Sequence, residues 1–174
     1  MMETFQRLIG EWHGEGSVPG DPPLAVSAEV TIDRLGEFLV MRTVGEPAEM
    51  PDTLSIIGGA PENAPQPMHY FDSRGVTRLF MTTLDGPRWT IWRAPGEDWR
   101  GPDGPGFDQR FIGDISADGD MIRGRWERGL GEAGDQWELD FPIDYVRKSL
   151  GPQAFKPLAP PTRSPSPLPM SQYR

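Results

Sequence analysis

Four polar side chains fall at positions where they could hold a ligand inside a β-structure. Arg42, Tyr70, Arg93 and Gln109 each continue an alternating run, so a period of two places them on the same face as apolar neighbours. A guanidinium inside an apolar interior costs several kcal/mol unless an acceptor pairs with it. An inward Arg42 or Arg93 would therefore anchor an anionic or carbonyl-bearing ligand.

The same two arginines also have an interpretation without a ligand. Each lies near a strand end, where it could reach water or pair with a carboxylate such as Glu127 or Asp108. A shift of one residue in strand register, or a β-bulge, would also turn either side chain outward. The sequence leaves both interpretations open.

A cofactor-free enzyme, such as an isomerase, cyclase or hydrolase, could use the same residues. Tyr70, Tyr145 or His69 would act as the general acid, and Arg93 would polarise a carbonyl group. The chain contains no Gly-x-Ser-x-Gly nucleophile elbow, no P-loop and no dinucleotide-binding fingerprint. Whether the protein is an enzyme therefore stays undecided by its sequence.

No metal or cofactor is expected. The absence of cysteine excludes disulfides, thiolate metal ligands and a cysteine nucleophile. His13 and His69 could meet Glu15 or Asp72 at a metal ion, but their wide separation in the sequence does not require it.

The charge of the chain argues against two classes of partner. Residues 151–174 carry three bases and no acid, so residues 1–150 carry 14 of the 17 bases and all 26 acids, a net charge of −12. Such a body repels phosphate backbones and anionic membrane surfaces, so neither nucleic acid nor membrane is expected as a partner. The chain has no long apolar span and its first residues do not resemble a secretory signal, so we expect a cytoplasmic protein.

Alternation of apolar and polar residues predicts an all-β body over residues 1–150. The clearest alternating runs are residues 26–32, 88–93, 121–128 and 137–145. Asp85-Gly86 and Asp118-Gly119 predict hairpin turns. About nine or ten strands with short connections and no helical pattern between them predict an antiparallel meander, which is either an up-and-down barrel or a sandwich. Pro142 predicts a bulge or an unpaired donor in the last strand.

The C-terminal segment, residues 151–174, differs in composition from the body. It is rich in proline and low in complexity, which predicts a disordered tail. Pro157-Leu158-Ala159-Pro160 matches a PxxP ligand, so a protein-interaction module acting through this tail is a further candidate function. A solvated tail without a partner is the simpler interpretation.

The segment Leu8-Ile9-Gly10-Glu11-Trp12-His13-Gly14-Glu15-Gly16, after a short helical turn, resembles the opening of lipocalin-like (calycin) barrels. It is similar to nitrobindin-type haem-binding barrels and to lipocalin-like bacterial proteins of unassigned function. The resemblance implies a barrel of about ten strands with Trp12 closing one end. Nitrobindin-type barrels hold haem iron through a histidine near the C-terminal end, whereas this chain has no histidine after His69, so haem is not expected.

A barrel of this width can enclose a cavity for one small ligand. In the last strand, alternation places five residues inward: Trp137, Leu139, Phe141, Ile143 and Tyr145. We therefore expect the chain to bind a small, largely apolar or anionic molecule, with contacts from Trp12, Arg42, Tyr70, Arg93, Gln109, Trp126 and Tyr145. Trp99, in the long loop at 94–106, could belong to a lid over the barrel mouth. Free strand edges would favour a homodimer, whereas a closed barrel has none.

Overall fold

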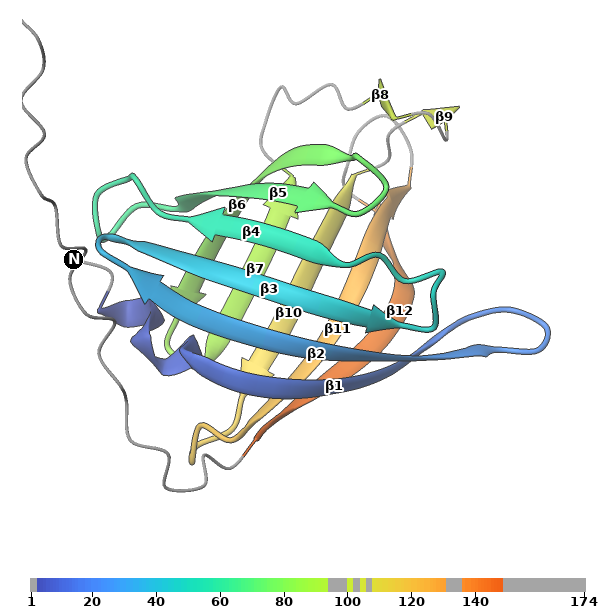
Figure 1. Ribbon diagram of the computed structural model, residues 1–174, viewed down its shortest axis with the longest axis horizontal. Helices are drawn as coiled ribbons and strands as arrows, with labels where there is room; N and C mark the ends of the chain where they lie inside the picture. Colours follow the sequence, from blue (N-terminus) through green and yellow to red (C-terminus); the bar gives the residue numbers. More distant parts are fainter. Residues whose placement is uncertain (1–2, 94–99, 102–103, 106–107, 131–135, 149–174) are drawn as a thin grey trace, which may run out of the picture.

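Ten strands form one closed antiparallel barrel (Figure 1). The computed structural model describes residues 3–93, 100–101, 104–105, 108–130 and 136–148. The barrel strands are β1 (Gly10–Val18), β2 (Leu24–Leu35), β3 (Phe38–Glu46), β4 (Thr53–Ile57), β5 (Gln66–Asp72), β6 (Thr77–Asp85), β7 (Arg88–Arg93), β10 (Gln109–Ile115), β11 (Met121–Leu130) and β12 (Gln136–Arg147). A 3₁₀ turn, η1 (Thr4–Leu8), precedes them, and β8 (Arg100–Gly101) pairs with β9 (Gly104–Pro105) in a separate hairpin.

The strands follow one another around the barrel in sequence order, and β1 closes the circle by pairing with β12. This arrangement confirms the predicted up-and-down barrel. These ten strands leave no free edge, so they cannot form the edge-to-edge strand pairing that would favour a homodimer. The domain boundary expected at residue 150 and the tail at 151–174 lie outside the described residues, as does Trp99. No helix in the described part of the chain could span a membrane.

The period of two is clearest in β2. In β2, Val26, Ala28, Val30 and Ile32 are buried, and the residues between them are half-buried or exposed. One face of each strand therefore packs inside the barrel and the other meets solvent, as alternation requires of an antiparallel sheet with one buried face.

A β-bulge interrupts this pattern between β11 and β12. Trp126 pairs with Phe141 but Glu127 pairs with Leu139, so Asp140 has no partner. The bulge confirms the irregularity predicted from Pro142. The extra residue reverses the alternation along β12.

The reversal corrects part of the predicted inward face. Leu139 is 53% exposed. Trp137 stacks under the guanidinium of Arg110, which lies 4.1 Å from the ring centroid and pairs with Glu127. The expected inward positions of Trp137 and Leu139 are therefore wrong, whereas Phe141, beyond the bulge, does face the interior.

Aromatic and aliphatic side chains close one end of the barrel. Phe5 and Leu8 of η1 are buried with Trp12 in the core, and the indole Nε1 of Trp12 donates to the carbonyl of Leu8 at 2.9 Å. Arg147, at the end of β12, lies over the Trp12 ring at 4.1 Å from its centroid. The predicted position of Trp12 at a barrel end is thus consistent with its surroundings.

Candidate functional site

The barrel encloses a cavity of about 430 Å³. All ten barrel strands and the loop between β3 and β4 contribute to its wall, from Trp12 near the closed end to Glu49, Met50 and Arg74 at the opposite, open end. Most of the wall is apolar. Pockets of about 300–1,000 Å³ with such walls are typical of small-molecule sites.

A connected series of aromatic rings forms the wall on the side of β5, β6, β7, β10, β11 and β12. Tyr70 meets Phe80 edge-on, and Phe80 in turn meets Trp126, at centroid distances of 5.8 and 6.4 Å. Trp126 contacts Phe111 at 5.4 Å, and Phe111 contacts Tyr145 at 6.3 Å. These edge-to-face and tilted contacts fix the rings relative to one another, so the wall is a preformed apolar surface.

Two glycines make room for these rings. At Gly124 a Cβ atom would lie 2.6 Å from both the carbonyl oxygen of Ile143 and a ring carbon of Phe111. At Gly14 a Cβ atom would lie 2.7 Å from a ring carbon of Tyr145. The rings of Phe111 and Tyr145 thus rest directly on the backbone of neighbouring strands, which keeps them against the wall.

Polar groups gather at the open end of the cavity. Tyr70, Arg74, Arg78 and Gln109 all contribute to its wall there. The Nη1 of Arg78 donates to the Oε1 of Gln109 at 3.2 Å. Burial lowers the pKa of Arg78, and the neighbouring Arg74 lowers it further, but a guanidinium remains protonated at neutral pH.

Asp72 organises the turn beside these groups. Its side chain is buried and its Oδ2 accepts from Nη2 of Arg74 at 2.7 Å and from the hydroxyl of Tyr70 at 3.2 Å. Its Oδ1 accepts from the backbone amides of Arg74 and Val76. Burial opposes ionisation of Asp72, but these hydrogen bonds prevail and hold its pKa below the ordinary value. Burial, with the negative charge of Asp72, raises the pKa of Tyr70 to about 12, so Tyr70 is a neutral hydroxyl.

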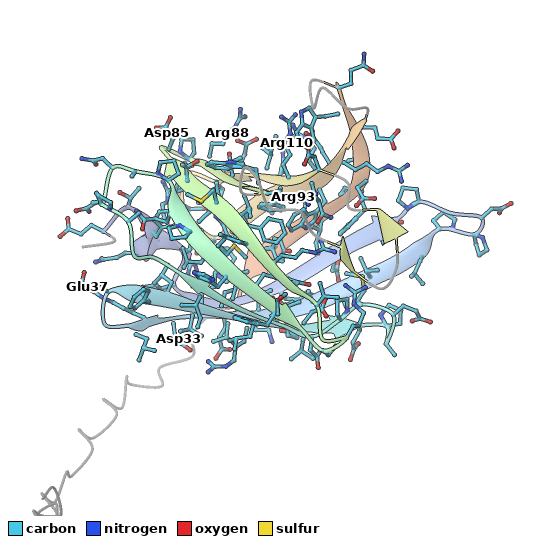
Figure 2. The ribbon with its side chains drawn as sticks, turned by 90° about the horizontal axis from the view of Figure 1, so that it is seen from above. Asp33, Glu37, Asp85, Arg88, Arg93 and Arg110 are labelled. Atoms are coloured by element: carbon cyan, nitrogen blue, oxygen red, sulfur yellow. The ribbon has the colours of Figure 1, made fainter. Side chains whose placement is uncertain are left out.

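The structure brings five of the seven residues expected at the site to the cavity wall: Trp12, Tyr70, Gln109, Trp126 and Tyr145. Arg93 pairs in register with the inward-facing Phe80 and is 16% exposed, with its Nη1 3.9 Å from Asp108. Arg93 is near the polar residues of the open end but does not itself form part of the cavity wall. Figure 2 shows Arg93 within the outline of the barrel, whereas Arg110, on the adjacent strand β10, lies at its outer side.

The expected inward position of Arg42 is wrong. Arg42 is exposed, and its neighbours Met41 and Thr43 line the cavity instead. In β3 both Leu39 and Val40 are buried, so the sequence there does not show which face is inner.

Sequence reasoning missed Arg74 and Arg78. Arg78 alternates with Phe80 and Thr82, two buried residues of β6, so the period of two could have identified it. Arg74 lies in the turn between β5 and β6, and no pattern in the sequence indicates that it reaches the cavity.

The other candidate acid–base groups are arranged differently. His69 is exposed and is not part of the cavity wall. His13 lies on the outer face, with Nδ1 2.7 Å from Glu29. Tyr145 is buried in the wall, which raises the pKa of its hydroxyl. Within the described ranges no three histidine or carboxylate side chains come together in a way that could hold a metal ion.

Comparisons with known proteins identify the fold. The sequence matches no family model and no curated protein. Among solved structures it is similar to Rv2717c from M. tuberculosis, with a TM-score of 0.65 and 13% sequence identity, over 84% of this chain and 96% of that one. At this identity the similarity shows a shared barrel fold alone. The resemblance to lipocalin-like and nitrobindin-type barrels stays a prediction.

Proposed function

We propose that this barrel binds a small, largely apolar molecule in its internal cavity. The observation that carries the proposal is a cavity of about 430 Å³ whose aromatic wall is held in place by ring–ring contacts. The charged side chains of the wall, Glu49, Arg74 and Arg78, lie toward the open end. A mostly apolar wall with a few convergent polar groups is the usual composition of a ligand site.

The packing of the wall supports a ligand of matching shape. Side chains that face a void lose the dispersion contacts that a close-packed interior provides. An apolar ligand would supply those contacts to Phe80, Trp126 and Phe111, and its transfer from water would add a hydrophobic contribution of about 25 cal/mol per Å² buried.

A cofactor-free enzyme is the second candidate, and one observation favours it. Tyr70 lines the cavity, and its pKa of about 12 keeps its hydroxyl protonated, so a substrate that took this hydrogen bond from Asp72 would make Tyr70 a general acid. Native mass spectrometry of freshly purified protein would give the mass of any bound molecule. Incubating that molecule with excess protein separates the candidates, since a binder returns it unchanged and an enzyme converts it.

A cavity-blocking variant provides the direct test of binding. Phenylnaphthylamine, a neutral dye that fluoresces in apolar surroundings, is titrated into the protein and into Thr43→Trp. Thr43 lines the cavity, so the indole would occupy the space of the dye and weaken its binding by about tenfold or more, equivalent to at least about 1.4 kcal/mol.

The neighbouring residue supplies a matched control. Val44 is 55% exposed on the outer face, so Val44→Trp adds the same side chain outside the cavity. Its dye affinity should stay within about twofold of the original protein, a difference well below 1.4 kcal/mol. Equal dye binding by the original protein and a folded Thr43→Trp variant would contradict the proposal.

A further inference from the structure

Three arginines cluster around the open end of the cavity. Arg74 and Arg78 form part of the wall, and Arg93 lies close enough to act electrostatically on Arg78. This cluster contrasts with the acidic body, which carries a net charge of −12 over residues 1–150. Two guanidinium groups thus form part of the cavity wall, where a bound molecule could contact them.

Three carboxylates of the described residues also lie near this end of the cavity. Asp72 binds Arg74 through Oδ2 and the backbone of its own turn through Oδ1, so its oxygens serve the turn. Asp108 is 53% exposed and faces Arg93 at 3.9 Å. Glu49 reaches the wall from the exposed loop between β3 and β4. Arg78 forms part of the cavity wall, and its Nη1 donates to the amide oxygen of Gln109 at 3.2 Å.

The groups next to Arg78 are suited to an anion. Gln109 accepts the Arg78 hydrogen bond through Oε1, so the other end of its amide is a donor at the cavity wall. Tyr70 adds a neutral hydroxyl to the same wall. Charged hydrogen bonds from a partly buried guanidinium to an anionic oxygen are among the strongest that proteins form.

We propose that the ligand is an amphiphile with one anionic head group, a carboxylate or a group of similar charge, which Arg78 binds at the open end of the cavity. The apolar body lies against Phe80 and Trp126, and the amide nitrogen of Gln109 donates a hydrogen bond to the head group. This inference rests on the proposed function, because it assigns the ligand class of the same cavity.

Two dyes with the same aromatic body test the charge preference. Anilinonaphthalenesulfonate is phenylnaphthylamine with a sulfonate added, so the ratio of their dissociation constants isolates the contribution of the anion. The original protein should bind the sulfonate at least about tenfold more tightly than the neutral dye. Arg78→Gln should reduce that preference, measured as the ratio of the two dissociation constants within the same variant, by about tenfold.

Two further variants control for net charge and for folding. Arg42→Gln removes the same charge from the outer face of β3 and should leave the preference unchanged. Arg78→Lys keeps a positive charge and should retain most of the preference, which separates loss of the anion site from a disturbed strand. Thermal unfolding by circular dichroism checks each variant.

Each outcome bears on the inference. Equal or tighter binding of the neutral dye by the original protein would overturn it without any variant, as would an unchanged preference in folded Arg78→Gln. Failure of the proposed function is distinguishable, because both dyes would then bind Thr43→Trp as well as they bind the original protein. Both proposals are supported if Thr43→Trp binds both dyes more weakly and Arg78→Gln loses affinity mainly for the sulfonate dye.

Discussion

Replacing Arg147 by methionine should destabilise the barrel more than any other single charge removal near its closed end. The Arg147 guanidinium lies 4.1 Å from the Trp12 ring centroid. Its Nη1 donates to the carbonyl of Ile9 at 2.7 Å, and its Nη2 donates to Arg7 at 2.7 Å and to Gly119 at 3.0 Å. One side chain therefore links the η1 segment, the turn before β11 and the end of β12.

The magnitude follows from these contacts. A desolvated cation–π contact contributes up to about 2 kcal/mol, and a hydrogen bond from a charged donor contributes about 1.5–3 kcal/mol. Arg147 is 22% exposed, so water can replace part of its bonding to the carbonyls. Methionine also keeps apolar contact with Trp12. We therefore expect a loss of about 3 kcal/mol, which for a protein of this size lowers Tm by roughly 6–12 °C.

Urea unfolding followed by tryptophan fluorescence measures the free energy of unfolding of Arg147→Met, and calorimetry gives Tm. Arg34→Met is the control, because Arg34 lies near the same end but is 42% exposed and bonds only within its own turn in the described contacts. The control should lose less than about 0.5 kcal/mol. If both variants lose the same small amount, the guanidinium does not hold the closed end together and the reasoning fails.

Two other substitutions test the inner wall and the outer face. Gly124→Ala should lose about 1–3 kcal/mol of stability in urea unfolding, because its Cβ atom would lie 2.6 Å from a backbone oxygen; an unchanged midpoint would refute this close packing. Glu127 accepts from Arg110 and Arg125 at 2.6 Å each, and these bonds outweigh burial and lower its pKa from 4.5. Since the folded state releases this proton more readily, Glu127 contributes stability above about pH 4.5 that is lost as the pH falls through the lower folded value. Glu127→Gln should thus be less stable than the original protein at neutral pH, with the difference narrowing in acid; a difference independent of pH would contradict the assignment.

The two proposals share a physical basis in the separation of apolar and charged groups inside the barrel. Phe80, Phe111 and Trp126 form the wall away from the opening, and the arginines lie where solvent is near. A charge deep in the barrel would require full desolvation, whereas Arg78 is only partly buried and retains favourable hydration. An amphiphile could therefore place its apolar body in the interior without removing its head group fully from water.

The sequence by itself determined the architecture and much of the inner face. Alternation of Val26, Ala28, Val30 and Ile32, with turns at Asp85-Gly86 and Asp118-Gly119, was sufficient for an antiparallel meander. Local pattern is informative here because each regular strand has one buried and one exposed face. The same period correctly predicted that Trp126 and Tyr145 face inward.

Only the tertiary structure decided the faces where local pattern is ambiguous or interrupted. Met41, rather than Arg42, lines the cavity, because β3 is apolar on both faces and its register depends on β2 and β4. Leu139 is exposed because the unpaired Asp140 reverses the alternation of inner and outer side chains. The sequence of β12 alone does not show this bulge, because its position depends on how β12 pairs with β11. The position of Arg78 beside Gln109 likewise comes from the sheet order β6-β7-β10, which brings residues 31 positions apart in the sequence within hydrogen-bond distance.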